Sequence, residues 1–472
     1  MMLLASVLAG CATVAPRPGF DDVGQLVSAR APGRTIQWNQ GTPEDEAAAE
    51  DVQELLSQEL TLESAVQIAL LNNRALQAVY GQLGIAQADL VQAGLLQNPI
   101  LSADVRFPTP AGLFTGAAVG LVQEVISILQ VPLRKRVAAA AFEEAKLTVS
   151  AAVIDLITAV KRAFYRLQGA EQMVELRRTV VGATALSADV AQRQHDAGNI
   201  TDLDLANERA LSEQARVDLA RVETEVAEDR EELMALMGLW GPATDWRIAP
   251  HLPDLPRDDV APVGLETLAV SQRLDLAGAR QRIHELLLSR DLTRLYRLLP
   301  TAALGVAAEH EVDDGAWSIG PAVEFPIPVF DQGQAALANQ SARLQQSANQ
   351  HTALAVAIRS QVRRTWTRMQ QARAVATHYQ GILLPLREKI IQQTELEYNA
   401  MLVGVFQLLL AKRDEIDAGR AYIEALRDYW VARTDLESAV GGELPLTESP
   451  AAAATPEAPG HLEPDHHHHH GG

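Results

Sequence analysis

Few side chains in this 472-residue chain are spaced as catalysis or metal binding requires. Neutral imidazoles bind divalent metal ions, so a run of five histidines near the C-terminal end is the clearest candidate. The run consists of His466, His467, His468, His469 and His470. A purification tag or a compositional accident would give the same string, and these alternatives stay open. No GxSxG, P-loop or HExxH motif accompanies it, so the sequence predicts neither an enzyme nor a cofactor.

Cys11 is the single cysteine, so the chain can form no internal disulfide. It ends a short apolar stretch, Leu8-Ala9-Gly10-Cys11, that resembles the lipobox of bacterial lipoproteins. The resemblance implies removal of residues 1–10 as a signal peptide and attachment of acyl chains such as palmitate to Cys11. Since Ala12 follows where an Asp would retain a lipoprotein at the inner membrane, it also implies outer-membrane sorting. The stretch before Cys11 carries no Lys or Arg, and a buried structural thiol is the alternative.

The charge balance limits the kinds of partner. The chain has 40 Lys and Arg residues against 60 Asp and Glu, which argues against nucleic acid as a partner and indicates a surface or lumen that repels anions. Aromatic residues make up only 4%, so Ala and Leu packed between helices are expected to supply most of the stability. No apolar run of roughly 18 residues occurs, so we expect no membrane-spanning helix.

Residues 133–196 form a proline-free run rich in Ala, Leu, Val, Glu, Arg and Gln, with apolar residues three and four apart. This pattern predicts one helix of about 64 residues, which would be on the order of 100 Å long. So long a helix needs others beside it, as in a coiled coil or a helical tube. A long soluble coiled coil is the alternative.

Residues 99–107 alternate in polarity with a period of two, which predicts a strand with two different faces. One face would hold Leu101, Ala103, Val105 and Phe107, and the other Ser102, Asp104 and Arg106. Further strands are expected at 117–125, 301–312 and 317–325. Four such strands match the wall of a transmembrane β-barrel but cannot close one, so several chains would have to assemble it. Soluble hairpins on a coiled coil are the alternative.

The second half of the chain repeats the first at an offset near 200 residues. Glu124 matches Glu324, Gly238 matches Gly441, and VKRAFYRLQGA from Val160 matches VRRTWTRMQQA from Val362. Each copy is expected to run helix, strand, strand, very long helix, turn, helix. The first helix should run unbroken from Thr61 to residue 99, and the long helix should begin after residue 132. We expect a signal peptide (1–10), a lipidated tether along the body (11–60), a first repeat (61–241), a linker (242–262), a second repeat (263–442) and a disordered tail (443–472).

From Thr61 to Gly442 the chain resembles the TolC-type outer-membrane efflux proteins. The resemblance depends on LTLESAVQIALLNNRAL from Leu60, QAGLLQNP before the first strand, the duplicated hairpins and the glycine-containing turns after the long helices. It implies a mainly α fold with a small transmembrane β part. It further implies a homotrimer with a twelve-stranded barrel in outer-membrane lipid. A helical tunnel would then meet a periplasmic adaptor protein and an inner-membrane pump.

The turns after the two long helices are, by this resemblance, the tunnel tips that contact the adaptor. The first contains Gly198, Asn199, Ile200 and Thr201, and the second contains Met401, Leu402, Val403 and Gly404. Met401 stands where the family has glycine and Gly404 follows three residues later, so the sequence leaves the geometry of the second turn open. The exposed apolar pair Leu402-Val403 favours a contact there. Plain hairpin turns without a partner are the alternative.

The family also narrows its tunnel with acidic residues just after the second turn. The matching positions here are Gln407 and Leu410, so that ring is missing. Asp202 and Asp204 follow the first turn, and Asp414 lies farther along the second hairpin. We hypothesise that Asp204 contributes to a constriction that attracts cations, the alternative being that these carboxylates face solvent.

The sequence therefore predicts a passive duct that exports small molecules or metal ions while a partner pump supplies the energy. A periplasmic helical adaptor would need a compact β-rich domain beside its hairpin, and none is evident in the sequence. A metal-binding scaffold would explain only the histidine tail.

Overall fold

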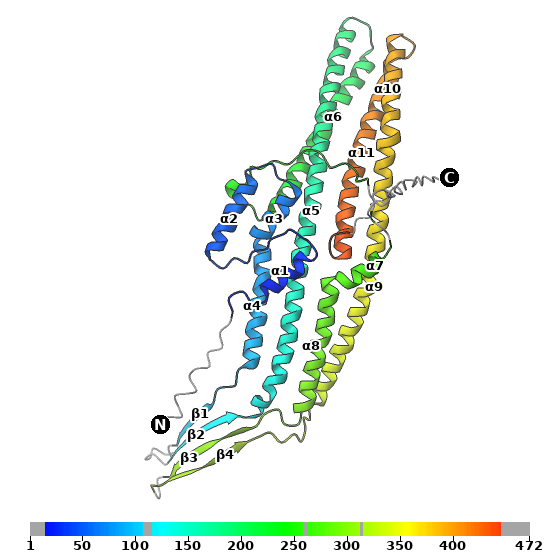
Figure 1. Cartoon of the computed structure of the whole chain (residues 1–472). Helices are drawn as coiled ribbons and strands as arrows, with labels where there is room; N and C mark the ends of the chain where they lie inside the picture. The colour runs from blue at the N-terminus through cyan, green and yellow to red at the C-terminus, as the bar shows by residue number, and fades with distance from the viewer. Residues whose placement is uncertain (1–14, 107–115, 258–259, 261–262, 312–314, 445–472) are drawn as a thin grey trace, which may run out of the picture.

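A computed structural model describes residues 15–106, 116–257, 260, 263–311 and 315–444. The molecule is an elongated rod with a small sheet at one end and two helical hairpins at the other (Figure 1). Cys11 and the histidines His466 to His470 lie outside the described residues.

The first repeat contains one helix that runs the length of the rod. Helix α5 has 71 residues, which corresponds to roughly 107 Å. Helix α4 lies beside its lower part and helix α6 beside its upper part (Figure 1). The elements are α3 (Leu62–Asn72), α4 (Arg74–Gly94), β1 (Ile100–Arg106), β2 (Gly116–Glu124), α5 (Ile126–Asp196) and α6 (Asp202–Met237).

The second repeat has the same order of elements. Its long helix is interrupted by a π-helical turn, η3, just before Pro385. The elements are α7 (Leu265–Gln272), α8 (Leu274–Tyr296), β3 (Ala303–Glu311), β4 (Trp317–Glu324), α9 (Gln334–His378), η3 (Tyr379–Leu383), α10 (Leu384–Asn399) and α11 (Val405–Val440). Gly182, near the matching position of the first long helix, lies inside a continuous α5, so the two long helices do not share this irregularity.

The segment for which we expected a tether along the body contains two helices, α1 (Phe20–Ser28) and α2 (Pro43–Leu56). The rings of Phe20, Trp38 and Tyr80 pack together, with 5.2 Å between the centroids of Phe20 and Tyr80. Lys146 on α5 binds Asp22 at 2.7 Å. Between the repeats, a short 3₁₀ turn, η2 (Gly241–Thr244), precedes a bridge that joins Ile248 to Leu60.

Two clusters of buried apolar side chains hold the middle of the rod together. The first joins α1, α3, α4, α5 and the end of α6, and includes Leu70, Leu167 and Met237. The second joins α7, α8, α9 and α11, and includes Ile358 and Met369. The sheet and the hairpin tips lie outside both clusters, so the rigid middle positions the two functional ends.

The expectation of one helix from Thr61 to residue 99 was wrong. The chain breaks at Asn73, which has extended backbone angles and whose Oδ1 caps α4 by accepting a bond from the Leu76 N–H at 2.8 Å. The Asn73 amide donates to the Leu236 carbonyl at 2.7 Å, and the Asn72 amide donates to the carbonyls of Met237 and Gly238. The break therefore satisfies the carbonyls that end α6.

The expectation that α5 begins after Pro132 was also wrong. The helix begins at Ile126, because the Glu124 carboxylate accepts bonds from the Ile126 and Ser127 N–H groups and satisfies the helix N-terminus. Pro132 lies within the second turn. Within the described residues, no helix combines the length and apolar character needed to cross a membrane.

Gly238 and Gly182 provide a matched test of this packing. Gly238 ends α6 with a φ of 69°, and a Cβ there would lie 2.7 Å from the Asn72 carbonyl oxygen, whereas a Cβ on Gly182 would meet open space. We expect Gly238→Ala to lower the free energy of unfolding by about 1–2 kcal/mol or more. Gly182→Ala should raise it by about 0.5–1 kcal/mol. Denaturant unfolding would check both, and equal effects would contradict the assignment of the junction.

Candidate functional site

The sheet at the lower end has two chemically different faces, as the alternation predicted. Its four strands are antiparallel in the order β1-β2-β3-β4. The register places apolar side chains opposite one another across the strands on one face. These are Leu101, Leu121, Val306 and Pro321 in one row, and Ala103, Val119, Ala308 and Ile319 in the next. The face is exposed: the relative exposure of Leu101 is 70% and that of Ile319 is 73%.

The other face of the sheet carries small and charged side chains. One row consists of Ser102, Gly120, Ala307 and Gly320. In the next rows Arg106 binds Asp104 on its own strand at 3.2 Å and Glu309 on β3 at 3.1 Å. This face is therefore shallow and polar, which suits contact with water.

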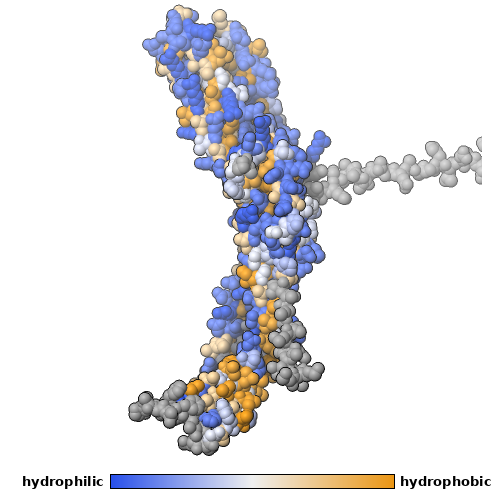
Figure 2. Space-filling view, turned by 90° about the vertical axis from the view of Figure 1, so that its left-hand side faces the viewer, coloured by the Kyte–Doolittle hydropathy of each residue, from blue (hydrophilic) through white to orange (hydrophobic). Residues whose placement is uncertain are grey.

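In the single chain, β1 and β4 are the two edges of this sheet, and each keeps backbone groups without a ladder partner along one side. Pro321 lies in β4, and an edge strand is where a proline is tolerated. In Figure 2, apolar residues gather over the sheet and the adjoining ends of the helices, while the upper half of the visible face is mostly hydrophilic.

The first tip turn is closed by a left-handed glycine. Gly198 has a φ of 77°, its N–H bonds to the His195 carbonyl, and the Asn199 N–H bonds to the Gln194 carbonyl. Thr201 then caps α6, and its hydroxyl donates to the Asp204 carboxylate at 2.8 Å. Ile200 is partly buried between these two polar ends.

The second tip turn has the same backbone geometry as the first, a point that the sequence left open. Met401 has a φ of 58° and is the single non-glycine residue with a positive φ in the described chain. Its N–H bonds to the Tyr398 carbonyl, and the Leu402 N–H bonds to the Glu397 carbonyl, which repeats the pattern of the first turn. Val403 is partly buried, and Gly404, with a φ of −84°, occupies the position before α11 that Thr201 occupies before α6.

The side chains of the second tip are the more exposed ones. The relative exposure of Met401 is 93% and that of Leu402 is 75%. Both side chains are thus large, apolar and mostly exposed to solvent, and the backbone of Met401 is strained. A contact with another molecule would explain these features.

The four residues named for a constriction lie in two places. Asp202 and Asp204 belong to the first hairpin: Asp202 is bound by the His195 ring at 2.6 Å, and Asp204 completes the capping box of α6. Gln407 and Asp414 belong to the second hairpin, where Gln407 is exposed and Asp414 pairs with Arg387 at 2.7 Å. The single chain therefore does not bring them together, and each carboxylate has a local partner.

Sequence reasoning missed a cavity of about 580 Å³ between the two hairpins. It is lined by both hairpins, with Val180 and Leu211 on one side and Ile391 and Leu408 on the other. Its lining comes from α5 and α6 in the first repeat and from α10 and α11 in the second. No periodic signal marks it, because the residues that line it come from two hairpins far apart in the sequence.

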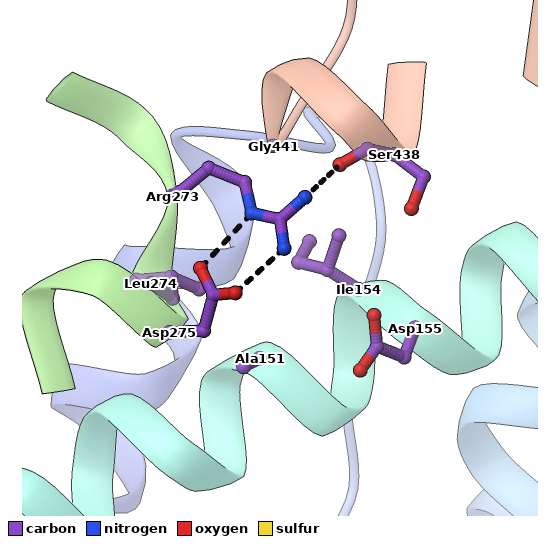
Figure 3. Close-up of a pocket in the computed structure, with 8 residues that line it drawn as sticks. All are labelled: Ala151, Ile154, Asp155, Arg273, Leu274, Asp275, Ser438 and Gly441. Atoms are coloured by element: carbon purple, nitrogen blue, oxygen red, sulfur yellow. Dashed lines mark hydrogen bonds and ion pairs between the residues drawn. The ribbon is translucent and has the colours of Figure 1, made fainter. Parts of the chain in front are cut away.

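The middle of the rod has a second junction, shown in Figure 3. Arg273 binds Asp275 through two hydrogen bonds of 2.9 and 2.6 Å and points a third donor at the Ser438 carbonyl at the end of α11. Burial raises the pKa of the nearby Asp155 carboxyl. Burial acts in the same direction on Asp275, but the bonds from Arg273 outweigh it and hold the pKa of Asp275 below its usual range.

This junction links the start of α8 to the end of α11. Its cavity measures about 70 Å³, too small for a substrate. Among the described residues, no group of three or more His, Cys, Asp or Glu side chains is placed to hold a metal ion. The described residues thus form a two-faced sheet at one end of a helical rod.

The comparisons with known proteins agree with this geometry. The model of the family described as "Outer membrane efflux protein" matches residues 65–239, which correspond to the first repeat. A membrane protein from Pseudomonas aeruginosa has a TM-score of 0.70 at 20% identity, with 80% of this chain and 92% of that chain covered. The structure of CusC has a TM-score of 0.68 at 18% identity, with 81% and 92% covered.

A curated relative extends the match to both repeats. The cobalt-zinc-cadmium resistance protein CzcC of Cupriavidus metallidurans is 24% identical over 393 residues, or 81% of this chain and 90% of the relative. By these matches the chain is similar to the outer membrane efflux proteins along both repeats. The toluene efflux pump outer membrane protein TtgC of Pseudomonas putida is 23% identical, with 74% and 75% covered. The TolC-type resemblance of the sequence is confirmed.

The positive φ of Met401 at the second tip turn allows a direct test. A non-glycine residue in the left-handed conformation costs roughly 1–2 kcal/mol. Met401→Gly should therefore stabilise the protein by about 1 kcal/mol, and Gly198→Ala should destabilise it by about the same amount. Thermal unfolding would compare the two variants with the parent. A destabilised Met401→Gly would show that the methionine side chain contributes more than its backbone costs.

Proposed function

We propose that this chain is the outer-membrane channel of a tripartite efflux system, a passive duct for small molecules or metal ions. The observation that supports this most is the sheet with one exposed apolar face and one shallow polar face. An exposed apolar band on strands of this length suits lipid, and the polar face suits a wet lumen.

The open edges of the sheet favour an assembly of several copies. In lipid no water can satisfy the free backbone groups of β1 and β4, and each unsatisfied group costs several kcal/mol. Pairing β4 of one chain with β1 of the next would satisfy them. Three chains would give twelve strands, and we propose this homotrimer because the resemblance implies it.

The opposite end of the rod is the proposed docking end. Helix α5, at roughly 107 Å, is long enough to carry the tips far from the membrane. We propose that the first turn (Gly198 to Thr201) and the second turn (Met401 to Gly404) contact a periplasmic adaptor. The adaptor would couple the duct to an inner-membrane pump.

A lipid anchor at Cys11 fits the position of α1. Gly19 lies against the Lys146 side chain, twenty residues above the start of α5, or on the order of 30 Å from the sheet. The eight steps from Cys11 to Gly19 could span at most roughly 26–29 Å. An acyl chain on Cys11 could thus just reach the membrane surface beside the sheet.

The class of exported substrate is inferred from the relatives and from the charge of the chain. CzcC is named for cobalt, zinc and cadmium resistance and TtgC for toluene efflux, so both metal ions and small organic molecules fit this family. The acidic composition favours cations, and His466 to His470 could hold metal near the duct. The alternative of a periplasmic adaptor would need a compact β-rich domain, and the described residues form one four-stranded sheet.

Neighbouring residues on β2 give the sharpest test of the wall. Val119 faces the apolar side and Ala118 the polar side. A lysine facing lipid near the bilayer midplane costs about 2–4 kcal/mol, whereas a lysine facing a wet lumen costs little. We expect Val119→Lys to prevent recovery of the protein in the outer-membrane fraction and Ala118→Lys to leave recovery unchanged. Equal recovery of both variants would contradict a lipid-facing wall.

The proposed constriction is tested at Asp204. Asp204→Asn removes the charge but keeps an oxygen that can accept the bond from Thr201. If Asp204 attracts cations into a narrow tip, this change should reduce the preference for cations in single-channel recordings by a few-fold. Unchanged conductance and ion preference would end this assignment.

A further inference from the structure

The ends of the helices next to the sheet carry a charge opposite to that of the whole chain. Within about ten residues of the sheet there are six basic side chains: Arg134, Lys135, Arg136, Arg290, Arg294 and Arg297. The acidic ones at this level are Asp89, Asp291 and Asp331, together with Glu124 and Glu324 at the ends of β2 and β4. The Glu124 carboxylate is engaged by the N–H groups of Ile126, Ser127 and Ala302. Overall, the chain has 40 basic against 60 acidic residues, so this local excess runs against its composition.

Exposed apolar side chains lie directly beside these basic residues. Ile128 and Leu129 in the first turns of α5, Leu298 just after α8, and Ile327 and Phe330 before α9 are all exposed. In Figure 2 the apolar surface of the sheet continues onto these helix ends.

The spacing on α5 stacks each basic residue above an apolar one. Lys135 is seven residues from Ile128, and Arg136 is seven residues from Leu129, so each pair shares a helix face about 10 Å apart. On α8, which runs in the opposite direction, Arg294 is four residues from Leu298. Both helices therefore present apolar residues toward the sheet and cations toward the helical body.

The N–H groups of these basic side chains make few hydrogen bonds or ion pairs within the described residues. Lys135, Arg136 and Arg294 make no hydrogen bond or ion pair with any residue that the structure describes. Arg297 makes one bond, of 3.3 Å, to the Gln332 carbonyl, and Arg290 makes one, of 3.4 Å, to its neighbour Asp291.

Two further features separate these cations from ordinary surface charges. The Asp331 carboxylate already accepts a bond from the Gly333 N–H at 2.8 Å, so it is partly engaged by its own loop. Beside Arg297 lies a cavity of about 600 Å³ lined by Tyr296, Ile327 and Phe330 among others. A cation at the rim of an apolar cavity suits a ligand with an anionic head and an apolar tail.

We propose that Lys135, Arg136, Arg290, Arg294 and Arg297, the basic collar, bind the phosphate groups of anionic phospholipids in the leaflet facing the helical body. The inference rests on the proposed function, since it requires the sheet to lie in a membrane. Long cationic side chains just above an apolar band extend toward headgroups, and each adds to the attraction for anionic lipid. The exposed apolar residues below the collar favour a lipid over a free phosphate ion.

The test measures lipid binding to the full chain in a neutral detergent by native mass spectrometry. Dioleoyl phosphatidylglycerol and dioleoyl phosphatidylcholine are added separately to the parent protein. We expect the parent to bind phosphatidylglycerol about tenfold more tightly, and this preference to fall as NaCl is raised. The quadruple change K135Q/R136Q/R294Q/R297Q should abolish the preference.

A matched control removes the same charge elsewhere. The change R359Q/R364Q/R368Q/K389Q alters four exposed basic residues on α9 and α10, far from the sheet, and should keep the preference. The proposal is overturned if the parent shows no preference, if the collar variant keeps it, or if millimolar inorganic phosphate displaces the lipid. The salt series uses the parent alone, so it decides even if the collar variant fails to fold. A parent that reaches the outer membrane yet shows no lipid preference would overturn the collar and leave the proposed channel intact.

Discussion

The structure depends on one constraint, the need of every buried backbone N–H and C=O group for a partner. In the middle of the rod that need is met by side chains that cross between helices, such as the Asn72 and Asn73 amides on the end of α6. At the sheet it is met only between neighbouring strands, and the outer sides of β1 and β4 stay open. For a lone chain, the exposed apolar face is unfavourable in water, and the open edge is unfavourable in lipid, where no water can bind its backbone groups. Association of copies resolves both problems, which is why the channel proposal follows from the sheet more than from the helices.

The duplicated halves solve the same problem with different residues. Where the first repeat uses Asn73 at the break between its two helices, the second uses Arg273, whose guanidinium joins Asp275 to the end of α11. Gly238 and Gly441 both have left-handed backbones and pack against these breaks. At the tips, Gly198 and Met401 close equivalent turns although only one is a glycine. The geometry has persisted in both copies while the chemistry that holds it has changed.

The sequence predicted best those features that repeat at a short period. The first strand was found because apolar and polar residues alternate strictly, as Leu101 and Ser102 do, and the long helix was found from its length and lack of proline. The break at Asn73 was missed because an asparagine pair inside an apolar pattern gives no local sign that it meets another helix end. The start of α5 was misplaced because Pro132 reads as a helix boundary, whereas the Glu124 carboxylate sets the boundary six residues earlier.

Features that arise from contacts between distant segments could not be predicted from the sequence. The cavity between the hairpins is lined by both repeats, and the basic collar combines Arg136 on α5 with Arg290 on α8, more than 150 residues apart in the chain. The packing of α1 against α5 depends on Phe20, Trp38 and Tyr80 meeting in space, and the polar composition of that segment hides it. The constriction residues show the reverse case, since Asp204 and Asp414 were noticed for their charge but are engaged by Thr201 and Arg387 within one chain.

The mass of the detergent-solubilised protein tests the central claim most directly. The account predicts a particle of three chains, each of 51.0 kDa or slightly less after processing, once bound detergent and lipid are subtracted. That particle should form discrete water-filled channels when added to a planar bilayer. A monodisperse single chain that stays soluble without detergent would contradict it.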